Sequence, residues 1–219
     1  MKIIAFGDIH EDIHNVDKMA NLSTASVVVI TGDLTNIGKR ENAQRVIEYV
    51  KRYNQSVYAL AGNFDQKDVC DYLSESGINL HGNAFVFQNV GIFGVGGSNP
   101  TPFHTPNEYS EEELEALIYK GYEKVNDSAV KIFVSHVPPF NTKIDRVQSG
   151  MHVGSEAVRR FIETHQPTVC ITGHIHEAAG QDTIGKTIMV NPGMFKDGGY
   201  VEIVAATSDL TVEMKSVMR

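Results

Sequence analysis

The chain has 219 residues, of which 42% are hydrophobic and 21% are charged, which is ordinary for a globular protein that buries a full core. Its net charge of −8 argues against strong nucleic-acid binding, because proteins that bind nucleic acids normally present a basic face. No apolar run approaches the roughly 20 residues of a membrane helix, and acidic residues come too early for a signal peptide, so we expect a cytoplasmic protein with no membrane partner.

The first part of the chain alternates apolar strands with amphipathic helices. We expect three strands and three helices in alternation, at residues 2–7, 13–22, 27–31, 39–53, 56–61 and 66–76. Strands that alternate with helices are usually parallel and are joined by right-handed crossovers. The first three strands are therefore predicted to run parallel to one another.

The middle of the chain follows a different pattern. A hairpin is predicted from strands at 84–88 and 91–95, and the Gly- and Pro-rich segment 96–110 is predicted to be an irregular loop. Ser110 and Glu113 have the spacing of a capping box, so a helix is expected from there to about residue 124. The acidic residues 111–113 are interpreted as a solvated face of that helix.

The remaining elements build a second sheet and a tail. We expect a strand at 130–135, a long loop at 137–154, a helix at 155–165 and a strand at 168–172. The tail is predicted to form antiparallel strands with turns at Asn191-Pro192-Gly193 and Ser208-Asp209, the strands being 186–190, 199–205 and 210–216. The chain contains no repeat or linker, so one domain over residues 1–219 is expected, with two sheets packed between helices.

Five short groups of Asp, Asn and His residues follow five of the apolar strands. They are Asp8-Ile9-His10, Gly32-Asp33, Gly62-Asn63-Phe64-Asp65, Ser135-His136 and Gly173-His174-Ile175-His176. The carboxyl ends of adjacent parallel strands meet at one edge of a sheet, so these side chains should converge there. Within Asp8-Ile9-His10 and His174-Ile175-His176, an extended backbone would point the two outer side chains the same way.

The composition of these groups favours a metal site. Imidazole and carboxylate ligands without thiolate suit Mn²⁺, Fe²⁺, Zn²⁺ or Co²⁺. A lone His at a strand end is more often a structural residue, so the prediction rests on the conjunction of all five groups. The candidates are too many for one ion, and two ions roughly 3.5–4 Å apart would orient a phosphoryl group and generate a hydroxide near neutral pH. The candidate ligands are Asp8, His10, Asp33, Asn63, His136, His174 and His176.

The order of these motifs, D-x-H, G-D, G-N-x-D, S-H-x-P-P and G-H-x-H, resembles the calcineurin-like metallophosphoesterase superfamily over essentially the whole chain. The segment GHIHEA followed by IGKTIMVNPG resembles its small prokaryotic phosphoesterase branch. The resemblance implies an α/β (α+β) fold, a four-layer αββα sandwich with two mixed sheets flanked by helices. It also implies a dinuclear site that hydrolyses phosphomonoesters or phosphodiesters.

The resemblance further implies how the ligands divide between the two ions. One ion would be bound by Asp8, His10, Asp33 and His176, and the other by Asp33, Asn63, His136 and His174, with Asp33 as the bridge. Asn63 and His136 would also be catalytic, as ligands that lie near the phosphate. Mn²⁺ is the expected metal, with Fe²⁺, Zn²⁺ and Co²⁺ as alternatives.

The sequence departs from the family pattern at Phe64, where the family usually has a His that protonates the leaving oxygen. A phenyl ring has no proton to give, and general acid catalysis is typically worth about 10²–10⁴-fold. Asp65, the usual partner of that His, is then expected to be a structural hydrogen-bonding residue. His152 is the preferred candidate to replace the acid and His104 the second; the alternative is a loop histidine bonded to backbone or water.

These observations predict a dinuclear phosphoesterase that cleaves phosphodiesters or activated phosphomonoesters through a metal-bound hydroxide, with a small phosphate ester as its substrate. The alternative is a catalytically weak or inactive metal-binding scaffold of the same fold, which would present an exposed apolar patch to a protein partner. The sequence leaves open the physiological substrate, the native metals and whether the protein forms a homo-oligomer.

Overall fold

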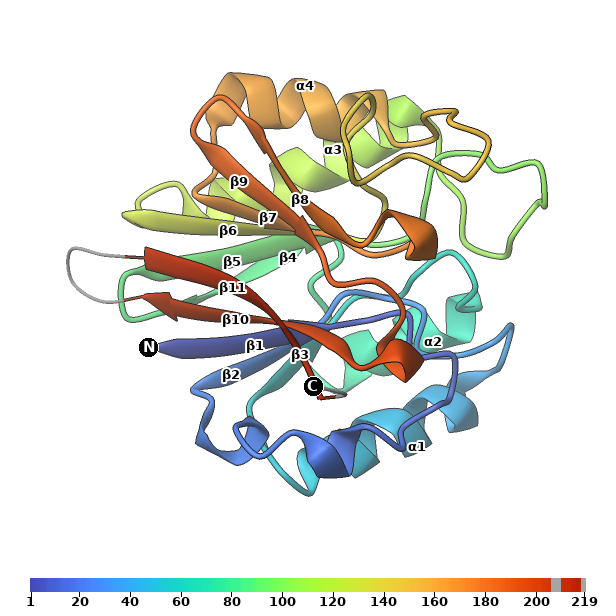
Figure 1. The fold of residues 1–219 in the computed structure, drawn as a ribbon, viewed down its shortest axis with the longest axis vertical. Helices are drawn as coiled ribbons and strands as arrows, with labels where there is room; N and C mark the ends of the chain where they lie inside the picture. Colours follow the sequence, from blue (N-terminus) through green and yellow to red (C-terminus); the bar gives the residue numbers. More distant parts are fainter. Residues whose placement is uncertain (206–209, 218–219) are drawn as a thin grey trace.

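Strand β1 (Lys2–Phe6) buries both of its faces, because its side chains alternate between two apolar clusters. Ile4 and Phe6 pack against helices, whereas Ile3 and Ala5 pack against a second sheet. In the computed structural model, which describes residues 1–205 and 210–217, two sheets therefore face each other between two helical layers (Figure 1). The predicted four-layer αββα arrangement with two mixed sheets is confirmed.

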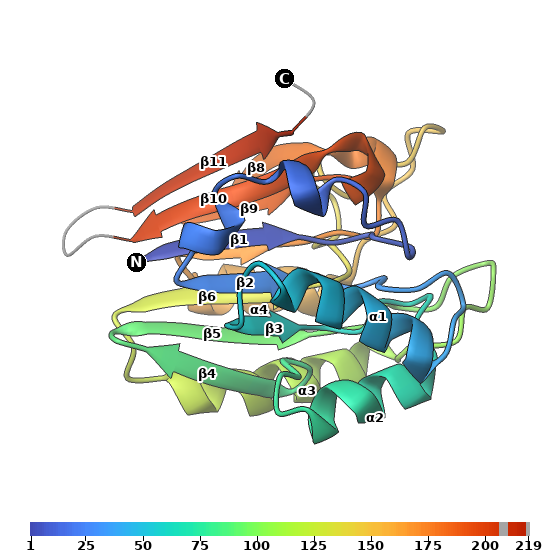
Figure 2. The same cartoon turned by 90° about the horizontal axis from the view of Figure 1, so that it is seen from below.

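The first sheet contains the amino-terminal strands. Its spatial order is β11 (Leu210–Ser216), β10 (Gly199–Ala205), β1, β2 (Val27–Ile30) and β3 (Val57–Ala59). Strands β1, β2 and β3 are parallel, as predicted, and β10 pairs antiparallel with β1. Helices α1 (Arg40–Lys51) and α2 (Lys67–Glu75) cover the outer face of this sheet (Figure 2).

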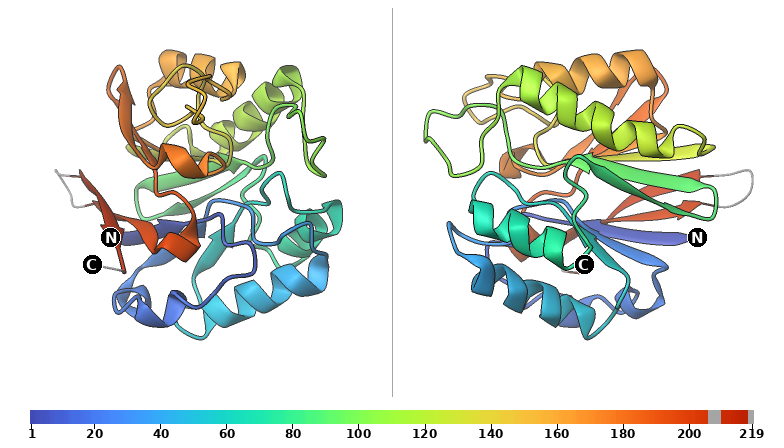
Figure 3. Two further views of the ribbon diagram at one scale, coloured as in Figure 1. Left: turned by 45° about the vertical axis from the view of Figure 1, so that its right-hand side comes forward. Right: turned by 180° about the vertical axis from the view of Figure 1, so that it is seen from behind.

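The second sheet contains the middle strands and two strands of the tail. Its spatial order is β4 (Asn83–Phe87), β5 (Val90–Val95), β6 (Val130–Ser135), β7 (Val169–Ile171), β9 (Thr187–Asn191) and β8 (Gly180–Ile184). The four central strands are parallel. Helices α3 (Glu111–Tyr122) and α4 (Glu156–His165) cover the outer face (Figure 3). No helix in the described ranges is long and apolar enough to cross a membrane.

The predicted helix near residues 13–22 is wrong. The segment instead forms two 3₁₀ turns, Val16–Lys18 and Leu22–Thr24. The side-chain amide of Asn15 is buried and donates to the carbonyl of Phe195, at 2.9 Å, so it ties the segment to the chain between β9 and β10. Such side-chain to backbone bonds compete with helix formation, which explains why the apolar spacing did not produce a helix.

The tail also differs from the prediction. The strand expected at 186–190 does not pair with that at 199–205, because β9 lies in the second sheet and pairs with β8 and β7. Strand β8 is not predicted by the sequence. It lies at the edge of the sheet, and its polar residues Gln181-Asp182-Thr183 do not show the apolar pattern by which strands are recognised. The turn predicted at Ser208-Asp209 lies outside the described residues.

The start of α3 connects the two helices that cover the second sheet. The capping box is confirmed, since Ser110 Oγ accepts from the Glu113 amide and the Glu113 carboxylate accepts from the Ser110 amide, at 3.2 and 2.8 Å. Glu111, however, is not simply part of a solvated face. Its carboxylate accepts from the hydroxyl of Ser155 at 2.6 Å and from the amide of Ala157 at 2.7 Å. It therefore caps the first turn of α4 from α3.

We expect Glu111→Ala to lower the free energy of unfolding by about 1–2 kcal/mol, because it removes the acceptor of two donors at the start of α4. Urea unfolding followed by circular dichroism measures this loss. Glu41→Ala is the matched control, since Glu41 is an exposed acid in the first turn of α1 and should change stability by no more than about 0.5 kcal/mol. Equal losses in the two variants would contradict the cap between α3 and α4.

Candidate metal centre

The five polar groups predicted from the sequence follow β1, β2, β3, β6 and β7. These strands belong to both sheets, and their carboxyl ends lie at the same end of the molecule, where the long loops gather (Figure 1). The sequence predicted that the side chains would meet at such an edge. The structure brings all seven predicted ligands together there, in two sets that share one carboxylate.

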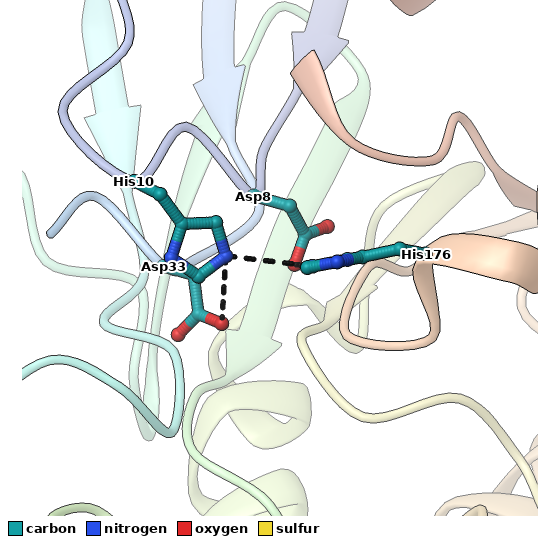
Figure 4. A group of neighbouring side chains, drawn as sticks. All are labelled: Asp8, His10, Asp33 and His176. Atoms are coloured by element: carbon teal, nitrogen blue, oxygen red, sulfur yellow. Dashed lines mark hydrogen bonds and ion pairs between the residues drawn. The ribbon is translucent and has the colours of Figure 1, made fainter. Parts of the chain in front are cut away.

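The first set consists of Asp8, His10, Asp33 and His176, each of which offers one ligand atom within 4.8 Å of the others (Figure 4). His10 Nε2 lies 3.7 Å from Asp33 Oδ2 and 3.4 Å from His176 Nε2. His176 Nε2 lies 3.2 Å from Asp8 Oδ1. Two buried carboxylates and two imidazoles are a donor set that suits a divalent ion of the Mn²⁺ to Zn²⁺ series.

The second set is centred on the side-chain amide of Asn63. Asn63 Oδ1 lies 3.0 Å from His136 Nε2 and 2.8 Å from His174 Nδ1. His136 Nε2 is also 3.5 Å from Asp33 Oδ2. The same oxygen of Asp33 thus faces His10 of the first set and His136 of the second, so Asp33 could be shared by two ions. The residues fit a pair of ions, and the division of ligands between two ions stays a prediction.

The backbone at several of these residues is left-handed. The φ angles are 50° at Asp8, 47° at His10, 47° at Asp33 and 69° at His174. A residue other than glycine in such a conformation costs on the order of 1–3 kcal/mol, and such residues cluster at functional sites. The concentration of this strain in four of the seven predicted ligands supports a functional role for this edge.

The extended backbone predicted within the two His-containing motifs is wrong. Strand β1 ends at Phe6, before Asp8, and His176 begins a 3₁₀ turn, so each pair of ligands is brought together by a turn instead of a strand. Backbone bonds stabilise these turns. The amide of His10 donates to the Asp33 carbonyl at 2.9 Å, and the amide of His174 donates to Asp8 Oδ1 at 3.0 Å.

Gly62 and Gly173 each precede a ligand at a position where no larger residue fits. A Cβ atom at Gly173 would lie 2.5 Å from Asp8 Oδ2, and one at Gly62 would collide with Asp33 Oδ1. Close packing of the main chain on a ligand carboxylate therefore requires glycine in the G-H and G-N motifs. Glycine at both positions leaves room for the two carboxylates.

The imidazoles differ in charge because their surroundings differ. His136 Nδ1 lies 2.9 Å from the carbonyl oxygen of Thr31, which orients the ring so that Nε2 faces Asp33. Burial opposes the charge of this imidazole, but the Asp33 carboxylate outweighs it and raises the pKa of His136 to about 9. Burial lowers the pKa of His174 to about 4. Without metal, His136 is therefore protonated at neutral pH and His174 is neutral.

Asp65 lies beneath the ligands and accepts four hydrogen bonds. Its carboxylate accepts from the amide of Leu34 at 3.0 Å, from the amide of Gly62 at 2.8 Å, and from the amide and hydroxyl of Thr35, both at 2.8 Å. It is fully buried and joins the loops that follow β2 and β3. These contacts agree with the structural role expected from the sequence.

A cleft of about 610 Å³ lies over the candidate ligands and is called here the metal-edge cleft. Its floor contains Asp33, Asn63, His174 and His176. Segments 99–103 and 147–153 form two walls, and Phe64 contributes to a third. The Phe64 ring packs edge-on against His10, with 5.4 Å between ring centroids. The sequence predicts both segments as loops but does not predict their apolar lining, whose signal is the presence of Phe103, Val147, Met151 and Val153 in these loops.

The two loop histidines do not line the metal-edge cleft. Met151 and Val153 face it, whereas His152, between them, places Nδ1 2.7 Å from Asp145 Oδ1. His104 is exposed and is likewise absent from the lining. The catalytic role predicted for His152 stays a prediction, since its imidazole is bound within its own loop.

Comparisons with known proteins agree with these features. A family model described as calcineurin-like phosphoesterase matches residues 1–178. The uncharacterized protein MJ1162 of Methanocaldococcus jannaschii is 38% identical over 197 residues, 88% of each chain. A probable glycerophosphodiester phosphodiesterase, GpdQ of Arcobacter nitrofigilis, is 25% identical over 183 residues, 78% of this chain and 65% of that one. The crystal structure of TT1561 of Thermus thermophilus has the same fold, with a TM-score of 0.73, 20% identity and coverage of 99% of this chain and 98% of that one.

Gly173→Ala is expected to weaken Mn²⁺ binding by about tenfold or more, because the added methyl group would displace the Asp8 carboxylate. Isothermal titration calorimetry measures the affinity. Gly180→Ala is the matched control, because a Cβ there would meet only the Ala178 carbonyl, at 3.9 Å. If both variants bound Mn²⁺ as tightly as the unmodified protein, the close approach of Gly173 would not matter to the site.

Metal binding should release at least about one proton near neutral pH, because an ion at Nε2 of His136 must displace the proton held there. The apparent affinity should therefore rise as pH increases toward the pKa of His136, about 9, and level off above it. Calorimetry in two buffers of different ionisation enthalpy measures the release. His136→Asn should reduce the release by about one proton and His165→Asn, a change on α4, should not; proton uptake by the unmodified protein would contradict the assignment.

Proposed function

The chain belongs to the calcineurin-like phosphoesterase family, and on that premise we propose that it is a dinuclear metal-dependent phosphoesterase acting on phosphodiesters or activated phosphomonoesters. The observation that carries the proposal is the pair of ligand sets that share Asp33 on the floor of the metal-edge cleft. Two divalent ions held there would supply a water nucleophile near neutral pH and neutralise the charge of the phosphoryl group.

The protein side chains in this proposal hold and orient the reacting groups. Asp33 is the shared ligand, and its burial keeps it in one position. The amide nitrogen of Asn63 donates to Thr105 Oγ1 at 3.1 Å, which turns its oxygen toward His136 and His174. Asn63 also lines the metal-edge cleft, so we assign Asn63, with the adjacent His136, to the side of the site that contacts the phosphate.

The choice of ester follows from Phe64. The ring lies in the wall of the metal-edge cleft, where its family counterpart would donate a proton to the leaving oxygen. Without that donor, an alkoxide of high pKa would leave slowly, whereas an aryloxide needs no proton. The likeness to a probable glycerophosphodiester phosphodiesterase supports a diester substrate. We therefore favour phosphodiesters and activated monoesters over simple alkyl monoesters.

The remaining parts of the proposal concern the metal and the setting. The donor set of imidazole, carboxylate and amide oxygen, with no thiolate, supports Mn²⁺, with Fe²⁺, Zn²⁺ and Co²⁺ as alternatives. We assign the activity to one domain over residues 1–219 in the cytoplasm, with a small phosphate ester as its partner. The net charge of −8 supports the absence of strong nucleic-acid binding.

One observation favours the alternative function, a metal-binding scaffold. The two most exposed large apolar side chains of the described residues are Phe103, at 83%, and Met151, at 63%, and both lie at the metal-edge cleft. An exposed apolar patch is what a protein partner would recognise. Against this reading, a scaffold has no physical need for a complete set of ligands held in a strained backbone.

The deciding measurement is the hydrolysis of paired aryl phosphomonoesters and phosphodiesters after Mn²⁺ loading. The unmodified protein should turn over the diester, and Asp8→Ala should lose about 10²-fold or more, because it removes a ligand from the first set. Phe64→His should raise activity most for esters with poor leaving groups, by up to about 10²-fold.

Phe64→Tyr is the matched control for Phe64→His, because it keeps an aromatic ring but offers only a weakly acidic hydroxyl. A gain limited to the histidine variant would assign the effect to proton donation. If the metal-loaded protein and the Phe64→His variant both lacked turnover above Asp8→Ala, the enzyme proposal would fail and the scaffold would take its place.

A further inference from the structure

The walls of the metal-edge cleft are mostly apolar, although its floor is polar. Proline and aromatic side chains come from segment 99–103, including Pro100, Pro102 and Phe103. Segment 147–153 faces them with Val147, Met151 and Val153. Phe64 and Ile175 extend the apolar surface down to the ligands. A molecule that reaches the ligands therefore passes mainly between apolar side chains. The polar members of the two wall segments are Asn99, Thr101, Gln148 and Ser149.

The charge of the metal-edge cleft limits how many phosphates a ligand can carry. None of the described residues that line it is Lys or Arg, and Glu177 contributes a further negative charge to Asp33. Lys143 and Arg146 belong to the same loop and line an adjoining hollow, which shares Val147, Gln148, Ser149 and Glu177 with the metal-edge cleft. A second phosphate inside the metal-edge cleft would stand next to Glu177, with no Lys or Arg in the lining of the cleft itself, which is unfavourable. The lining of the cleft itself therefore favours a substrate with one phosphate, placed at the ligands.

We propose that the metal-edge cleft binds the apolar alkyl or aryl substituent of a substrate that carries a single phosphate. The inference rests on the proposed function and narrows its substrate class. The apolar substituent would lie between Phe103 and Met151, and the phosphate would lie at Asn63 and His174. Burying such a substituent gains affinity in proportion to the apolar area removed from water.

The shape of the site favours a small apolar group over a protein partner. A hollow of about 610 Å³ is within the usual range for small-molecule pockets, roughly 300–1,000 Å³. A stable protein interface instead buries about 800 Å² on each partner over a broad surface. The apolar surface here is also continuous with the floor that carries the ligands, so a protein seated on it would cover the metal centre.

Binding of alkylphosphonates tests the inference without turnover, because their carbon–phosphorus bond is not an ester. Mn²⁺-loaded protein is titrated with methyl-, butyl- and hexylphosphonate by calorimetry. Each methylene that becomes buried should tighten binding by up to about fourfold, so the butyl compound should bind at least about tenfold more tightly than the methyl compound.

Two sets of variants locate the effect. Phe103→Ser combined with Met151→Ser should reduce the butyl-to-methyl ratio to about threefold or less, because it weakens the binding of butylphosphonate far more than that of methylphosphonate. Both residues are largely exposed, so the changes should not disturb folding. Val86→Ser is the matched control, because Val86 is 52% exposed on β4 and does not line the metal-edge cleft.

The outcomes separate this inference from the proposed function. Tight binding of methylphosphonate with no gain along the series would overturn the apolar subsite and leave the phosphoesterase standing. No binding of any phosphonate by protein that has taken up Mn²⁺ would sink the proposed function and the inference with it. The unmodified protein could instead be a dimer that dissociates in the double variant, with no effect of chain length on phosphonate binding. That outcome would assign the surface of Phe103 and Met151 to contact with a second copy of the chain.

Discussion

Asp33 lies 1% exposed at the edge where the two sheets meet, and a buried carboxylate of this kind must be paired. Its Oδ2 atom faces His10, which follows β1 in the first sheet, and His136, which follows β6 in the second. Its Oδ1 atom accepts from the amide of Phe64, and its carbonyl accepts from the amides of Ile9 and His10. The loops after three strands therefore take their positions from one residue, and the two halves of the site are fixed relative to each other.

The backbone conformation around Asp33 costs conformational free energy. Left-handed backbone at Asp8, His10 and His174 adds to that at Asp33. Without metal, a proton on His136 balances part of the buried negative charge. Cations bound between the same groups would replace that proton. We therefore interpret the strained backbone as a conformation that holds the ligands ready for metal binding.

The sequence predicts which residues meet, because strands are set by local apolar runs and the carboxyl ends of parallel strands must converge. It does not predict how they meet: the turns at Asp8 and His174 depend on bonds to residues distant in the chain. The same limit explains the failed helix at 13–22, since Asn15 binds a carbonyl 180 residues away. Strand β8 is not predicted because it is a polar edge strand. Its backbone pairing with β9 stabilises it, and its sequence shows little hydrophobic periodicity.

Phe64 links the chemistry of the proposed site to its specificity. The residue removes the proton donor expected at this position and supplies part of the wall that continues toward Phe103 and Met151. Substrates that need no acid are those with stable leaving anions, and aryl groups with this property are also apolar enough for such a wall. An apolar wall also excludes water, which strengthens the electrostatic interactions of the floor with a phosphate. A histidine here would restore the acid but place a polar ring in the wall, so leaving-group range and apolar binding change together.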